Sequence, residues 1–245
     1  MHGWDWDAFR RYLLNSYLLE GAWTTVWLSV AVMAFGLVLG LVAALMRMSR
    51  SHVLGGAASF YVWLMRGTPL LVQLIIIYTG LPQVGVRFTV IQSALLGLSL
   101  NEGAYLSEII RAGIVSVPRG QFDAARAIGM PYATMMRVVV MPQAARVIIP
   151  PMGNNFNGLL KTTSLASVIS LEELLRRSQM LIQLEFKVLE IFVVAALYYL
   201  VLTSLWGIVQ RRLERRYGRG YGVPSGAAPR PILPIDRTLQ EQDAR

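Results

Sequence analysis

The sequence places one arginine inside an otherwise uncharged apolar stretch. Nine uncharged residues precede Arg66, and twelve more follow the tetrapeptide that it opens, Arg66–Pro69. A guanidinium in hydrocarbon costs roughly 2.5–3.5 kcal/mol on insertion scales, so we expect it to face a cavity or a partner. Gly67 and Pro69 break the helix there, and transporters bind substrates at such mid-membrane breaks. We therefore expect Arg66, or the backbone around Gly67 and Thr68, to bind a carboxylate, with Gln73 closing the motif. The alternative is an arginine that snorkels from a helix end.

A second polar set follows on the next apolar segment. Asn101, Tyr105 and Glu108 are spaced by four and three, so they share one face of a helix. Glu102 lies one residue off that face. Glu108 and Arg111 can pair along their own helix, which is a structural explanation of both. The other three are candidate substrate contacts, with Glu102 neutralising an ammonium group.

Three hydroxyl side chains stand together after a run rich in Gly and Asn. They are Thr162, Thr163 and Ser164, next to Lys161. Irregular backbone is tolerated at membrane depth only where it is buried in protein or lines a wet cavity. We expect these hydroxyls to line the same cavity as Arg66 and to contact amino or side-chain groups of the substrate. The alternative is that they bind neighbouring helices.

The other candidate site is an amphipathic stretch, residues 121–142, between two apolar segments. Gly129 and Pro131 interrupt it, because Gly costs about 1 kcal/mol and Pro about 3 kcal/mol inside a helix. We expect one short helix before a corner at Gly129 and another from Tyr132 onward, with Pro131 at or near its first turn. A short helix at the membrane surface offers a contact for a partner outside the bilayer.

The composition excludes a soluble domain and several kinds of site. Of 245 residues, 55% are hydrophobic and 15% are charged, whereas soluble domains have about 45–50% apolar and about 25% charged residues. The chain has no cysteine, and His2 and His52 are too far apart to suggest a metal pair. The net charge of +9 gathers at the ends of apolar segments, as on cytoplasmic membrane flanks rather than in nucleic-acid binders. The P-loop pattern GxxxxGK[ST] is absent from the sequence.

The apolar segments predict an all-α membrane protein with about five transmembrane helices. A span needs about 20 apolar residues. Basic residues after the first and last spans predict an N-terminus outside and a C-terminus in the cytoplasm. The fourth segment is marginal, but this orientation requires it. The predicted spans are 24–46, 57–81, 90–114, 144–160 and 188–209.

The rest of the chain divides into three predicted parts. Residues 1–22 carry aromatic and charged residues typical of an interfacial segment, with an ordinary loop as the alternative. Residues 23–217 form one membrane domain, which includes a short amphipathic helix outside at 172–185. Residues 218–245 are rich in Gly, Pro and charge and are predicted to be a disordered cytoplasmic tail.

The stretch 121–142 resembles the EAA loop of bacterial ABC importer permeases. In that loop an acid and two alanines precede a Gly by three residues, and a hydrophobe-x-hydrophobe-Pro follows after nine more. The matching positions here are Asp123, Ala124, Ala125, Gly129, Val139, Met141 and Pro142. Asp stands where the family usually has Glu. The resemblance implies that Gln121, Asp123, Ala124, Ala125, Ile128, Gly129 and Pro142 couple the chain to an ATPase.

Three further pieces are similar to the polar amino acid permeases of the same class, which handle His, Arg, Gln, Glu and opines. They are residues 66–73, 102–129 and 161–169, within a likeness that covers about 23–217. The family often has Asp or Asn at the position of Thr162, so Thr weakens a preference for Arg or Lys.

The resemblance implies a type I ABC importer-like permease subunit in the bacterial cytoplasmic (inner) membrane. Its implied partners are a dimer of ABC ATPase subunits, a second permease, an external solute-binding protein and the lipid bilayer, without nucleic acid. The second permease is this chain or a sister chain. No cofactor is expected, because the ATPase subunits use the ATP, and the chain itself is not expected to be an enzyme.

Three alternatives remain. In the first, the chain belongs to the same importer class, but the cargo is an opine or another small zwitterion. A secondary transporter would also have a broken helix, but it would lack a docking loop. A membrane enzyme would need a metal cluster or a Ser/His arrangement, which we do not find in the sequence.

Overall fold

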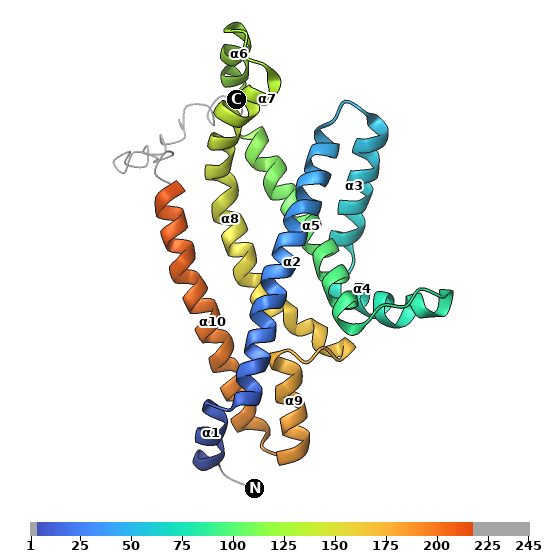
Figure 1. Ribbon diagram of the computed structural model, residues 1–245, viewed down its shortest axis with the longest axis vertical. Coiled ribbons are helices and arrows are strands. Elements are labelled where there is room, and N and C mark those ends of the chain that lie inside the picture. The colour runs from blue at the N-terminus through green and yellow to red at the C-terminus, as the bar shows by residue number, and fades with distance from the viewer. Residues whose placement is uncertain (1–3, 218–245) are drawn as a thin grey trace, which may run out of the picture.

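The computed structural model describes residues 4–217, which are mainly helical and include no strand (Figure 1). Four helices of more than 20 residues, α2, α5, α8 and α10, form an elongated bundle. The elements are α1 (Trp6–Leu13), α2 (Ser16–Met48), α3 (His52–Gly67), α4 (Leu70–Ile75), η1 (Ile76–Gly80), η2 (Leu81–Val84), α5 (Val90–Val115), α6 (Arg119–Ala127), α7 (Tyr132–Met135), η3 (Met136–Val140), α8 (Met141–Thr162), η4 (Thr163–Ile169), α9 (Leu174–Glu185) and α10 (Val188–Tyr217). The predicted tail at 218–245 lies outside the described residues.

Of the five predicted spans, two fall on single helices that are long and apolar enough to cross a membrane, and a third falls on a bent pair of helices. Within the described residues, α2 and α10 are each long and apolar enough to cross a membrane. The helix α3 and the segment Leu70–Val84 pass the same test together, but they bend by 103° at their break. The second predicted span is therefore a bent pair, with its bend at the break predicted around Gly67 and Pro69. Figure 1 shows α4, η1 and η2 leaving the bundle sideways.

Glycines bring α2 and α5 into close contact. A Cβ atom at Gly40 of α2 would lie 2.8 Å from the Cβ of Leu106 and 3.0 Å from the carbonyl oxygen of Gly103. A Cβ atom at Gly103 of α5 would lie 2.8 Å from the Cβ of Leu39. Small residues let membrane helices pack closely where water supplies no hydrophobic drive. This contact fixes α5, which carries Asn101, Glu102 and Tyr105, against the longest helix.

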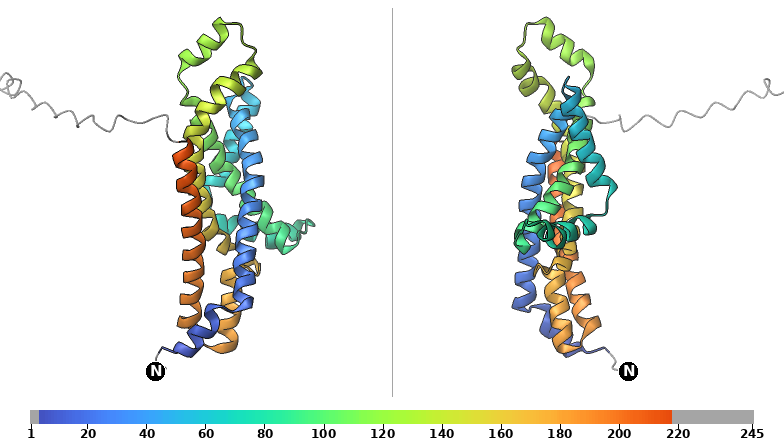
Figure 2. Two further views of the ribbon diagram at one scale, coloured as in Figure 1. Left: turned by 60° about the vertical axis from the view of Figure 1, so that its left-hand side comes forward. Right: turned by 90° about the vertical axis from the view of Figure 1, so that its right-hand side faces the viewer.

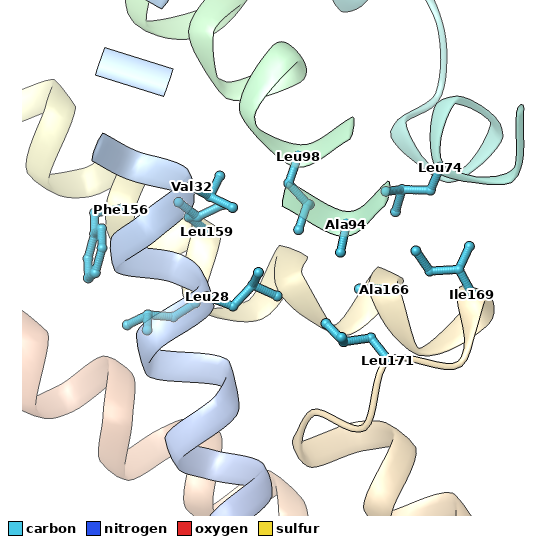
Figure 3. Close-up of a cluster of buried hydrophobic side chains, with 11 residues drawn as sticks. Leu28, Val32, Leu74, Ala94, Leu98, Phe156, Leu159, Ala166, Ile169 and Leu171 are labelled. Carbon is cyan, nitrogen blue, oxygen red and sulfur yellow. The ribbon is translucent and has the colours of Figure 1, made fainter. Parts of the chain in front are cut away.

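An apolar cluster anchors the irregular segments beside the site (Figure 3). It joins Leu28 of α2, Leu74 of α4, Leu98 of α5 and Ile169 of η4, all at most 2% exposed. Burying a leucine or isoleucine side chain stabilises a fold by roughly 1.5–3 kcal/mol. The short elements α4 and η4 are therefore held by tertiary packing rather than by their own length.

The end of the bundle that holds the N-terminus carries α1 and α9. The predicted interfacial segment contains α1, but α2 already begins at Ser16, eight residues before the predicted first span at 24. Arg177 on α9 lies 2.5 Å from Glu20 and over the ring of Tyr17, at 4.5 Å from its centroid. This basic residue is therefore paired with an acid of α2.

Candidate functional site

A cavity of about 490 Å³ lies beside the break between α3 and α4, with α5 and α8 as its other walls. Small-molecule sites have volumes of roughly 300–1,000 Å³. The lining includes one cation, one carboxylate, two amides and two hydroxyl groups from threonine, next to leucine side chains. Seven predicted substrate residues line it: Arg66, Gly67, Thr68, Asn101, Glu102, Tyr105 and Thr162.

The break itself is stabilised by two side-chain amides. Thr68 is extended and Pro69 has no N–H, so carbonyl groups at the end of α3 lose their helical partners. The amide of Gln73 donates to the carbonyl oxygens of Met65 (2.9 Å) and Thr68 (3.2 Å). The amide of Asn101 also donates to Met65, at 3.0 Å, and to the side-chain oxygen of Gln73. Gln73 is buried and supports the break, so the structure does not bring it to the cavity.

We expect Gln73→Leu to destabilise the protein by about 1–3 kcal/mol, because it removes a buried amide that donates to the carbonyl oxygens of Met65 and Thr68 and accepts a hydrogen bond from Asn101. The measurement is the melting temperature of the purified protein in detergent or nanodiscs. The control is Gln83→Leu, which removes an exposed amide of η2 and should stay within about 0.5 kcal/mol. Equal melting temperatures for the two variants would contradict this role of Gln73.

The cavity presents one negative and one positive side chain. Glu102 is 7% exposed, and its carboxylate accepts a hydrogen bond from the Asn155 side chain. The guanidinium of Arg66 lies 5.2 Å from the ring centroid of Tyr105 and 3.3 Å from the carboxylate of Glu108. A guanidinium binds a carboxylate through strong charge-assisted hydrogen bonds. The pair suits a ligand with a carboxylate at one end and an ammonium at the other.

The three consecutive hydroxyls do not share a surface. Thr162 lines the cavity, whereas Thr163 is fully buried and donates to the carbonyl oxygen of Leu160. Ser164 lines a different cavity together with Lys161. Successive residues of a helix point about 100° apart, and the chain stays helical from α8 into η4. Of the three hydroxyls, the structure therefore brings only Thr162 to this cavity.

Sequence reasoning missed three participants. Asn155 and Gly158 line the cavity, and their spacing of three and four residues from one another and from Thr162 would have shown the shared helix face. Arg47 donates to the carboxylate of Glu108 at 2.7 Å. The two are 61 residues apart in the sequence, so no local pattern indicates this contact.

The second candidate site is the corner formed by α6 and α7. It projects beyond the end of the bundle opposite α1 and α9 (Figure 2). Gly129 has φ +73°, a left-handed conformation that favours glycine after a helix end. The N–H of Met130 donates to the carbonyl oxygen of Ala125, which closes α6. The corner predicted at Gly129 is confirmed.

The predicted coupling residues divide between two faces of this corner. Ala125 is buried and packs into an apolar cluster with Met135 of α7. The outward face holds Asp123, Ala124 and Ile128, and the side chain of Ile128 is 75% exposed. Gln121, Gly129 and Pro142 are exposed too, and Gln121 accepts a hydrogen bond from Gln143. Ile128 and Asp123 give this projecting helix an apolar and a charged side chain that a partner protein could contact.

Comparison with known proteins finds relatives that are permease proteins of amino acid transport systems. Residues 36–219 match the family described as "Binding-protein-dependent transport system inner membrane component". The chain is 44% identical over 203 residues to the L-cystine transport system permease protein TcyB of Bacillus subtilis, which covers 82% of this chain and 87% of the relative. It is 38% identical over 231 residues to the arginine transport system permease protein ArgU of Corynebacterium glutamicum, covering 89% and 73%. It is 36% identical over 214 residues to the glutamine transport system permease protein GlnP of Escherichia coli K12, covering 86% and 97%.

Solved structures share the fold. A crystal structure of an amino acid ABC transporter with histidines matches with a TM-score of 0.82 and 36% identity, over 88% of this chain and all of that chain. An inward-facing structure of the MetNI methionine ABC transporter matches with a TM-score of 0.70 and 20% identity, over 82% and 96%. The second likeness is one of fold alone.

Proposed function

The chain belongs to the family of binding-protein-dependent transport system inner membrane components, and from this premise we propose that it is the permease subunit of an ATP-driven importer of polar amino acids. The observation that carries the proposal is the cavity beside the α3–α4 break, which is lined by both Arg66 and Glu102. This charge pair fits the carboxylate and ammonium that all amino acids share.

The proposed topology has five crossings, with the N-terminus outside and the C-terminus in the cytoplasm. The crossings are α2, the bent pair of α3 with Leu70–Val84, α5, α8 and α10. Arg47 in the last turn of α2 and Arg50 just after it support this orientation, since cytoplasmic flanks carry an excess of Lys and Arg. The corner of α6 and α7 would then lie in the cytoplasm, and α1 and α9 outside, in a bacterial inner membrane.

The proposed substrate contacts follow from the cavity. Arg66 and the backbone at Gly67 and Thr68 would bind the carboxylate, while Glu102 would bind the ammonium. Thr162 and Asn155 would face the substrate side chain. Thr162 supplies a hydroxyl rather than a carboxylate, which suits a neutral polar side chain better than a cationic one. An opine or another small zwitterion would meet the same charge pair.

The proposed partners match the surfaces of the chain. A dimer of ABC ATPase subunits would bind the outward face of α6. The ATPase subunits would bind and hydrolyse the ATP, and the permease would need no cofactor. A second permease, identical or sister, and an external solute-binding protein complete the importer. Each partner moves the chain between inward-open and outward-open states only by binding one state better than the other.

The test is uptake by the reconstituted complex. The permeases and the ATPase are reconstituted in proteoliposomes, and the solute-binding protein is added. These proteoliposomes should accumulate radiolabelled L-glutamine, L-arginine or L-cystine. Accumulation should require ATP in the compartment that the ATPase faces. We expect no accumulation when the ATPase subunits are omitted. Accumulation driven by an ion gradient without ATP would instead support a secondary transporter, and the proposal would be wrong.

A further inference from the structure

One carboxylate joins three helices at one side of the cavity. An oxygen of Glu108 on α5 lies 2.7 Å from Arg47 of α2 and 3.3 Å from Arg66 of α3. Its other oxygen lies 3.2 Å from Arg111. Arg47 and Arg66 both stand in the last turn of their helices. Glu108 follows the cavity residues Asn101, Glu102 and Tyr105 along α5, so the cluster lies on the side of the cavity toward the end of α5 that leads into α6.

Arg66 serves two surfaces at once. It lines the cavity, and it is also an ion-pair partner of Glu108. A guanidinium has five N–H donors in a fixed plane, and a bidentate contact to a carboxylate uses two of them along one edge. Arg66 shares one Glu108 oxygen with Arg47, so its present contact is a single long one. The Arg66 atom that contacts Glu108 is Nη1, so a ligand carboxylate that binds the edge containing Nη1 would displace Arg66 from Glu108.

We propose that Glu108 is a positioning residue that competes with the substrate carboxylate for Arg66, so that loading the cavity loosens α3 from α5. This inference rests on the proposed function, since it takes the ligand to be an amino acid with its carboxylate at Arg66. Arg47 sets the strength of the competition, because it occupies the Glu108 oxygen that Arg66 needs. Coupling between two binding events is reciprocal. Substrate therefore weakens the Arg66–Glu108 contact as much as that contact weakens substrate binding.

Two substitutions should change affinity in opposite directions. Glu108→Gln removes the competing negative charge and should tighten binding about fivefold, the lower end of measured couplings. Arg47→Gln leaves Glu108 to Arg66 and should weaken binding by a similar factor. The assay is equilibrium binding of radiolabelled L-glutamine, or the member of the uptake panel that the wild-type complex transports fastest, to the complex in nanodiscs. The methyl ester of the same amino acid has no carboxylate charge, so it should show neither change.

A double-mutant cycle separates competition from a general charge effect. In an Arg66→Ala background, Glu108→Gln should no longer tighten binding, because no guanidinium is left to release. A gain that persists there would reveal a field effect on the ligand and overturn the inference. The second readout is ATP hydrolysis. In Glu108→Gln the contact is already loose, so we expect the ratio of substrate-stimulated to basal hydrolysis to fall.

The failure of this inference differs from that of the proposed function. If Arg66→Ala alone leaves affinity unchanged, the carboxylate site of the proposed function is wrong. If Arg66→Ala weakens binding but Glu108→Gln and Arg47→Gln shift affinity in the same direction, the site stands and the competition is wrong. Should Glu108→Gln fail to assemble, Glu108→Asp keeps the charge with a shorter reach, and it should tighten binding by a smaller factor. Weaker binding in that variant would also overturn the inference.

Discussion

Replacing Arg66 with alanine is expected to raise the Kd for the transported amino acid about 30-fold. Removing one partner of a hydrogen-bonded charge pair costs about 2–5 kcal/mol, and about 1.4 kcal/mol is a factor of ten in Kd. We take the lower end, because the Arg66 side chain is 43% exposed and water screens part of the attraction. Equilibrium binding to the complex in nanodiscs measures this directly, and uptake at low substrate concentration should fall in parallel.

Two variants control for loss of charge and loss of fold. Arg87→Ala removes an exposed arginine from the turn before α5 and should leave the Kd unchanged. Arg66→Lys keeps a cation but loses the planar pair of donors, so it should restore only part of the affinity. If Arg66→Ala bound the amino acid as well as the wild type does, the carboxylate would have to lie elsewhere in the cavity. The same result with full uptake would remove the cavity from the transport route.

Local signals in the sequence were enough to place the helix break. Arg66, Gly67 and Pro69 combine a cation, a flexible residue and a missing donor within four positions, and α3 does end at Gly67. The corner at Gly129 was equally local, because a left-handed residue after a helix depends on glycine more than on tertiary contacts. Each prediction rested on a residue whose backbone chemistry restricts the chain by itself.

The roles of three other side chains were not predictable in this way, because they depend on contacts that form only in the folded chain. Gln73 was predicted to contact the substrate because its side chain is polar and lies in the motif. In the structure its amide instead donates to carbonyl groups at the helix break that precedes it. Thr163 does not line the cavity as predicted, because the chain stays helical past Thr162 and turns the next side chain away. Arg47 was interpreted only as a membrane flank, since its pairing with Glu108 depends on how α2 packs against α5.

Replacing Ile128 with serine is expected to weaken binding of the ATPase about 30-fold and to abolish coupled uptake. Ile128 is 75% exposed at the end of α6, on the face that also presents Asp123. An apolar anchor that becomes fully buried in a partner's pocket contributes about 2 kcal/mol or more, which is about 30-fold in Kd. The measurements are the affinity of the purified ATPase for the permease in nanodiscs and the rate of ATP-driven uptake. Amino acid binding to the cavity should stay unchanged, because the corner projects beyond the end of the bundle.

A matched control distinguishes a specific contact from a general loss of apolar surface. Val53→Ser removes a side chain that is 80% exposed near the start of α3, on the same predicted side of the membrane, and should leave ATPase binding intact. Gly129→Ala tests the geometry instead, since a Cβ in the left-handed conformation costs about 1–2 kcal/mol and should redirect α6. Both Ile128→Ser and Gly129→Ala should separate ATP hydrolysis from uptake. The first variant removes an apolar contact and the second changes the backbone at the corner. Full coupling in both variants would therefore mean that the ATPase binds the permease somewhere other than α6.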